Sequence, residues 1–112
     1  MENTPNLAMP YIAPAQAQKH VTHNDAIRLL DAVVQIAVET RTFTSPPQAA
    51  ADGHRLIVAA GAAEEWQGHE NEIAAWQDAS WHCYEPKPGW TCWLTDEGRL
   101  IVWRDDSWND AL

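Results

Sequence analysis

The stretch Ile73–Trp81, IAAWQDASW, decides the fold, because its pattern recurs 27 residues later in Leu100–Trp108 as LIVWRDDSW. Each copy runs from apolar residues into a Trp, continues through Asp and Ser, and ends on a second Trp. Asp and Ser form turns by hydrogen bonding to their own backbone, and Trp side chains flanking a turn pair across a hairpin. The repeat therefore predicts two hairpins, and two copies are too few for a propeller or a solenoid.

Other short apolar runs extend this pattern to both sides. Turn signals such as Pro86–Gly89 and Asp96–Gly98 separate the runs at a spacing of about ten residues, which is typical of an antiparallel meander. We therefore expect one small Trp-rich β domain over residues 54–112. Its predicted strands are His54–Ala59, Glu72–Trp76, Trp81–Tyr84, Trp90–Leu94 and Arg99–Trp103.

Residues 22–40 are predicted to form a single helix, with Thr22 as N-cap and Asp25 in the capping-box position. Its apolar side chains make two stripes and leave only a narrow polar face, so we expect it to be buried on more than one side. One side would then pack on the chain's own β domain, and the other on another copy of the chain. The alternative is that one face packs on the domain's own sheet. The stripes are Ile27, Leu30, Val34 and Val38, and Leu29, Val33, Ile36 and Ala37.

The segment before this helix, residues 1–21, contains Pro5, Pro10 and Pro14. Proline at this density opposes a helix and favours extended chain, so we expect an arm that is ordered only where another surface holds it. Residues 41–53 are expected to be a linker, and the whole chain to be one α+β domain. The predicted subunit-interface residues are Leu7, Tyr11, Ile12, Leu29, Val33 and Ile36.

Composition excludes several classes of function. The 112 residues carry 7 basic and 16 acidic side chains and a net charge of −9, so we expect binding neither to nucleic acid nor to an anionic membrane. No signal peptide or membrane-spanning stretch is recognisable, so synthesis in the cytoplasm is expected. A hairpin closed by Pro86–Gly89 would place Cys83 opposite Cys92, as a disulfide or as two free thiols.

We expect no catalytic residue, metal or cofactor. The sequence has no nucleophile elbow, P-loop or dinucleotide fingerprint, and its acidic residues concentrate in turns. His20 and His23 stand three residues apart, while His54, His69 and His82 follow no recognisable ligand spacing. A small hydrolase is therefore the weakest of the alternatives.

Seven tryptophans, all between Trp66 and Trp108, exceed what one small core needs. Trp76 and Trp103 end apolar strands and are expected in the core. Four others adjoin turns and are candidates for docking, either to a protein partner, where Trp is a typical hot-spot residue, or to a sugar ring. These are Trp66, Trp81, Trp90 and Trp108.

The segments Thr4–Asn24, Leu29–Asp31, Gly53–Val58, Ile73–Asp78 and Pro88–Trp90 together resemble a domain family of unknown function from alphaproteobacterial prophages and gene transfer agents, the phage-like particles that package host DNA. The resemblance covers nearly the whole chain. It implies a non-enzymatic structural component of such a particle, closest to a head-spike base.

A protein of this kind would form a homo-oligomer, pentamer or trimer, and link capsid protein at a vertex to a spike fibre protein. It would be extracellular after lysis of the host. The alternative is a carbohydrate-binding module that recognises host capsular polysaccharide through exposed Trp.

Overall fold

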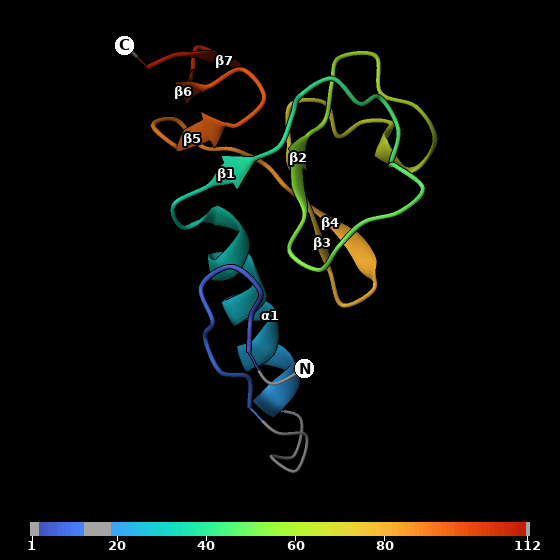
Figure 1. Cartoon of the computed structure of the whole chain (residues 1–112), viewed down its shortest axis with the longest axis vertical. Helices are drawn as coiled ribbons and strands as arrows, with labels where there is room; N and C mark the ends of the chain where they lie inside the picture. Colours follow the sequence, from blue (N-terminus) through green and yellow to red (C-terminus); the bar gives the residue numbers. More distant parts are fainter. Residues whose placement is uncertain (1–2, 13–18, 112) are drawn as a thin grey trace. The chain divides into compact units, whose positions relative to one another are not determined.

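The computed structural model describes residues 3–12 and 19–111 (Figure 1). By its internal contacts the chain divides into two compact units, Met1–Val34 and Gln35–Leu112. The first contains helix α1 (Lys19–Val33), and the second contains a short 3-10 turn η1 (Glu64–Trp66) and a β-rich region, so the α+β class is confirmed. The strands are β1 (Ala37–Val38), β2 (Arg55–Ile57), β3 (Ile73–Gln77), β4 (Ser80–Tyr84), β5 (Thr91–Leu94), β6 (Arg99–Arg104) and β7 (Ser107–Asp110).

The helix differs from the predicted range 22–40 at both ends. It spans Lys19–Val33, so Thr22 lies inside it and is not its N-cap. At the other end Gln35 adopts a left-handed conformation with φ of 51°, and Ala37 enters β1, where it pairs in parallel with Trp93. Because β-branched residues dominate positions 33–38, a strand competes well with a helix there.

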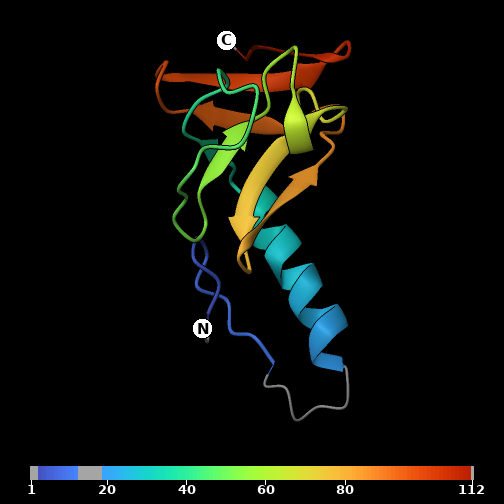
Figure 2. The ribbon, with the colours of Figure 1, turned by 90° about the vertical axis from the view of Figure 1, so that its right-hand side faces the viewer.

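The β region forms two sheets rather than one meander, in the orders β2-β3-β4 and β1-β5-β6-β7 (Figure 1). Each sheet contains one copy of the repeat as a hairpin, which can be followed in Figure 2. Trp76 lies opposite Trp81, and Trp103 opposite Trp108, as the sequence predicts. The ring centroids of the two pairs are 5.3 and 5.4 Å apart in edge-to-face geometry.

Both hairpins turn through two residues with positive φ. These are Asp78 and Ala79 in the first, at 52° and 60°, and Asp105 and Asp106 in the second, at 54° and 58°. Positive φ at both central positions is the signature of the type I′ turn, whose twist matches that of the flanking strands. The shared Asp is therefore the local reason for both hairpins, since Asp tolerates this conformation better than most residues.

The repeat extends to a third strand that the nine-residue pattern does not reveal. Gly53 N–H donates to Trp76 O at 2.8 Å, and Gly89 N–H donates to Trp103 O at 2.9 Å. Both glycines have positive φ, 86° and 95°, which a side chain would oppose. Strands β2 and β5 thus enter their sheets at the same register, and the β region consists of two equivalent three-stranded meanders.

A single segment, residues 36–43, joins the two meanders through backbone hydrogen bonds. On one side Ile36 O accepts from Trp93 N and Val38 O accepts from Thr95 N, both at 2.9 Å. Further along, Thr40 O accepts from Ile57 N at 3.0 Å and Phe43 O from Ala59 N at 2.9 Å. Of these four acceptors, three lie in the predicted helix range 22–40, and Phe43 lies in the predicted linker 41–53.

The buried residues of the β region lie on both meanders. Leu56, Val58, Ala62 and Ala74 pack with Trp66 in one cluster, against which Trp81 and Cys83 lie half-buried. On the other meander and on β1 the fully buried side chains come from alternate positions of the strands. They are Val38, Cys92, Leu94 and Ile101.

The N-terminal arm folds back on itself. Thr4 N–H donates to Met9 O at 2.8 Å, and Asn3 and Pro10 form an antiparallel bridge. The Thr4 hydroxyl is buried and accepts from Met9 N at 2.9 Å. The described part of the arm is thus a closed loop rather than extended chain, while Pro14 and its neighbours lie outside the described residues.

The type I′ turns give a stability prediction. Replacing Ala79 by Gly should raise the free energy of unfolding by about 0.5–1 kcal/mol, because the left-handed conformation costs a Cβ-bearing residue more than glycine loses in chain entropy. Chemical denaturation measures the change. Ala63→Gly is the matched control, since Ala63 is exposed and extended with φ of −133°. Ala63→Gly should lower the free energy of unfolding. A higher free energy of unfolding in both variants would contradict the assignment of the effect to the left-handed conformation of Ala79.

Candidate functional site

In the N-terminal unit, Asp31 is fully buried and holds the arm to the helix. Its carboxylate accepts from Leu7 N–H at 2.6 Å, from Asn6 N–H at 3.0 Å and from the Asn6 amide group at 2.9 Å. About two helical turns earlier, the Asn24 side chain pairs with both backbone groups of Ile12, at 2.9 and 3.1 Å. The two polar side chains therefore satisfy backbone groups of the arm and fix it along one face of α1.

The part of α1 away from Asn24 and Asp31 exposes an apolar stripe. We define the helix stripe as Ala26, Leu29, Leu30 and Val33, which follow i, i+3, i+4, i+7 spacing and so share one face. Leu29 is 39% exposed and Leu30 45%; Ala26 is also exposed, and Val33 is half-buried. The arm covers one face of α1 and leaves this stripe exposed within the chain, so burial of a second face against another copy stays a prediction.

The predicted interface residues fall into three groups. Leu7 and Leu29 are exposed, whereas Tyr11, Ile12 and Val33 are half-buried. The Tyr11 ring lies under the Arg28 guanidinium at 4.9 Å. Ile36 is a correction: it lies outside the helix, is 5% exposed and contributes its carbonyl to β5 pairing.

The tryptophans divide differently from the prediction. Trp66 is only 1% exposed, so its assignment as a docking residue is wrong: it is the centre of a core cluster. Trp81, Trp90 and Trp108 are half-buried, and Trp108 Nε1 donates to Asn71 O at 2.9 Å, which is a structural contact. The expected core residues, Trp76 and Trp103, are also only half-buried.

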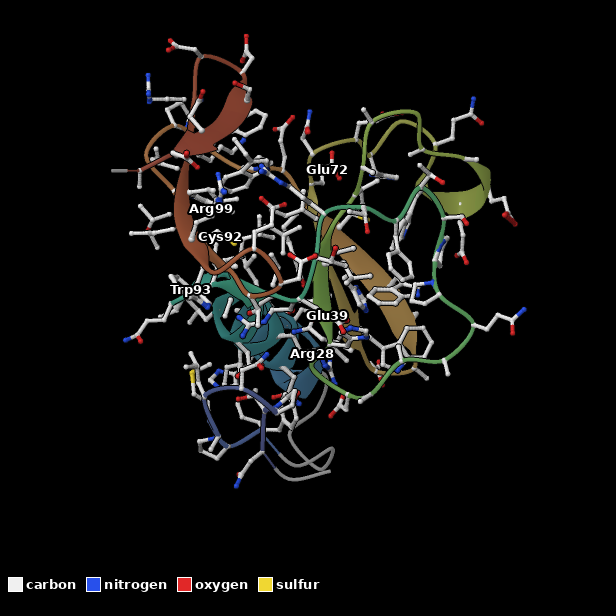
Figure 3. The ribbon with its side chains drawn as sticks, turned by 45° about the horizontal axis from the view of Figure 1, so that its top comes forward. Arg28, Glu39, Glu72, Cys92, Trp93 and Arg99 are labelled. Carbon is white, nitrogen blue, oxygen red and sulfur yellow. The ribbon has the colours of Figure 1, made fainter. Side chains whose placement is uncertain are left out.

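Trp93, which the sequence does not single out, is the most exposed tryptophan at 44%. It lies directly opposite Leu100, itself 38% exposed, on β5 and β6. A shallow cavity of about 260 Å³ includes both residues with Arg99 and Asp110, whose side chains pair at 3.1 Å. Two of the residues that line this cavity, Trp93 and Arg99, are labelled in Figure 3. We call Trp93, Leu100 and this ion pair the Trp93 surface.

A second cavity, of about 340 Å³, lies beside the buried Trp66 cluster. His69 Nδ1 and Glu72 Oε1 are 2.7 Å apart, and ligand atoms of these two residues and of Cys83 all lie within 4.8 Å of one another. Within the described residues, Trp66 Nε1 is buried without a hydrogen-bond partner. The residues that line the cavity are Glu65, Trp66, His69, Trp81, His82, Cys83 and Tyr84.

The two cysteines are free thiols, and the predicted pairing across a hairpin is wrong. Cys83 is in β4 opposite Ala74, and Cys92 is in β5 opposite Ile101, so they belong to different sheets. Burial raises the pKa of Cys92 to about 12. Burial, together with the charges of Glu72 and Glu65, raises the pKa of Cys83 to about 11. Neither thiol is a nucleophile near neutral pH.

These features define a two-unit α+β protein with an exposed apolar helix face and a cavity rich in His, Glu and Cys. A family model matches residues 23–109, and the chain belongs to that family, described as "Protein of unknown function (DUF2793)". No curated protein matches the sequence significantly. None of the described helices combines the length and the apolar character that crossing a membrane requires.

The buried carboxylate of Asp31 gives the prediction for this unit. Asp31→Ala should leave the amides of Asn6 and Leu7 without acceptors and destabilise the unit by about 2–3 kcal/mol. In the variant, the hydrogen-exchange rates of these two amides should be higher than in the wild type. The helical circular dichroism signal should also be lost at a lower temperature. Asp25→Ala is the control, because Asp25 is exposed and forms a surface ion pair with Arg28, and it should change stability by less than about 0.5 kcal/mol. Unchanged protection in Asp31→Ala would contradict this role.

Proposed function

We propose that the chain is a homo-oligomeric structural adaptor of a phage-like particle, a head-spike base that links the capsid to a host-surface-binding fibre. The observation that carries the proposal is the helix stripe. An aligned row of exposed Ala, Leu and Val side chains on a helix is costly in water, and burying it against copies of itself is the simplest way to cover it.

The distribution of large exposed apolar side chains supports an assembly role for the N-terminal unit. Of the eight such residues in the described chain, five lie before residue 35, although this unit has fewer than a third of the residues. They are Leu7, Leu29, Leu30 and Val34, together with Val21, which lies on the other side of α1 from the helix stripe and is not assigned to the association surface.

Charge favours association through the same unit. The chain carries −9 overall, but the first 34 residues contain only two basic and three acidic side chains. The N-terminal unit therefore adds little like-charge repulsion of its own to a contact between two copies through α1. The β region remains free for a different partner, such as capsid or fibre protein.

Leu30→Asp tests the adaptor proposal. In a symmetric oligomer the change is repeated in every copy, so dissociation should become at least about 100-fold easier, with a few kcal/mol lost per interface. Light scattering after gel filtration, over a range of concentrations, gives the mass of the wild-type oligomer and of the variant. Particles assembled with the variant should lack spikes.

Val21→Asp is the matched control, because Val21 is 51% exposed but lies on the other side of α1 from the helix stripe. It should leave the mass unchanged. A wild-type chain that stays monomeric at high concentration, or a Leu30→Asp chain that remains oligomeric, would overturn the proposal.

The Trp93 surface favours a second candidate function, a carbohydrate-binding module for capsular polysaccharide. An exposed indole face beside the Arg99–Asp110 pair offers an apolar platform with polar groups at its edge, which suits a pyranose ring. In this candidate function the sugar-stacking residue is Trp93, in place of the four tryptophans next to turns that the sequence suggests.

Trp93→Ala should abolish retention on immobilised capsular polysaccharide while the thermal transition stays within a few degrees of wild type. Phe43→Ala removes another exposed aromatic ring, 39% exposed, and should not change retention. Equal retention of both variants and the wild type would remove the Trp93 surface from consideration.

A further inference from the structure

We propose that His69, Glu72 and Cys83 bind a zinc ion, with the fourth coordination position open to an oxygen ligand in the adjoining cavity. Imidazole, carboxylate and thiolate are the three side-chain groups that zinc prefers. The inference rests on residues of the β region alone, so it stands or falls independently of the adaptor proposal.

The backbone around these residues is fixed before any metal arrives. His69 N–H donates to Trp66 O, and Glu72 N–H donates to His69 O, at 2.9 and 3.0 Å. Glu72 O accepts from Val58 N at 3.0 Å, which ties this loop to the end of β2. Cys83 is in the middle of β4, paired with Ala74. Three ligands from two hydrogen-bonded segments therefore come together, and two of them, His69 and Cys83, line the cavity.

The distances fit a closed site with small adjustment. His69 Nδ1 and Glu72 Oε1 are 2.7 Å apart, and the three ligand atoms lie within 4.8 Å of one another. Ligands of a tetrahedral zinc ion stand roughly 3.3–3.7 Å apart, given metal–ligand distances of about 2.0–2.3 Å. Rotation of the side chains closes this difference. The zinc binds the His69 tautomer that has its proton on Nε2, a change of tautomer that releases no net proton.

The charge of the cavity favours a cation. Glu65 lines the cavity, and the Glu72 carboxylate belongs to the cluster, so acidic side chains surround the place of the ion. The charge of a zinc ion stabilises the thiolate form of a cysteine ligand. Binding at pH 7 therefore releases the Cys83 proton to solvent as the Zn–S bond forms.

The burial of Trp66 and its unpartnered indole N–H bear on the fourth coordination position of the zinc. Trp66, only 1% exposed, lines the cavity, and its Nε1–H has no hydrogen-bond partner among the described residues. A buried donor of this kind is costly unless something accepts from it. An oxygen ligand on the zinc, water when nothing else is present, supplies an acceptor in the space that Trp66 lines. His82 also lines the cavity, but it contacts Ser80 and Gln77 O and is not assigned as a ligand.

Cobalt(II) titration of the chelator-treated full chain tests the site. One equivalent should produce a thiolate-to-cobalt charge-transfer band, and one equivalent of zinc should remove it, because zinc binds the same ligands more tightly. Cys83→Ser should abolish the band. Cys92→Ser is the matched control, since Cys92 is buried in the other sheet, and should retain it.

Glu72→Gln preserves shape and should fold, while zinc affinity measured by calorimetry should fall at least about tenfold. Release of a proton on zinc binding, measured in two buffers of different ionisation enthalpy, should disappear in Cys83→Ser. Absence of the band in the wild type, its persistence in Cys83→Ser, or equal zinc affinity of wild type and Glu72→Gln would overturn the proposal.

Discussion

The architecture of the β region depends on the backbone pairing of residues 36–43 with both meanders. This segment gives its carbonyls to β5 first and then to β2 and the chain beyond it. Buried backbone groups must be paired, and the residues after α1 find their partners in β5: Ile36 O accepts from Trp93 N, and Ala37 begins β1. The left-handed Gln35 is where the chain changes from one pairing scheme to the other.

Local chemistry made the hairpins predictable, and long-range pairing made the sheet order unpredictable. Asp78 and Asp105 mark type I′ turns within a few residues, so both hairpins and five strands could be placed from the sequence. The parallel pairing of β1 with β5 joins residues more than fifty positions apart and leaves no periodic signal. Positions 33–38, rich in Val and Ile, fit a helix or a buried strand equally well, which is why the predicted helix was too long.

The candidate sites show how far a repeat can be trusted. Ile57 and Trp93 occupy the same position of the two meanders, opposite Ile73 and Leu100, which are equivalent residues of the repeat. Yet Ile57 is 2% exposed and Trp93 44%. The sequence predicts the two hairpins but not what covers each face of the sheets, and so it placed Trp66 outside and overlooked Trp93. The proposed zinc ligands were missed for a related reason, because His69 and Glu72 come from a loop and Cys83 from a strand.

The two meanders therefore differ in surroundings rather than in construction. In the first, residues 58–72 fold over one face of the sheet, bring Trp66 into the core and leave a polar cavity with His69 and Cys83 in its wall. In the second, the face that carries Trp93 and Leu100 stays bare. The proposed zinc site and the proposed docking surface thus lie on different meanders. In the proposed adaptor, binding an ion and docking a partner would therefore not compete for the same face.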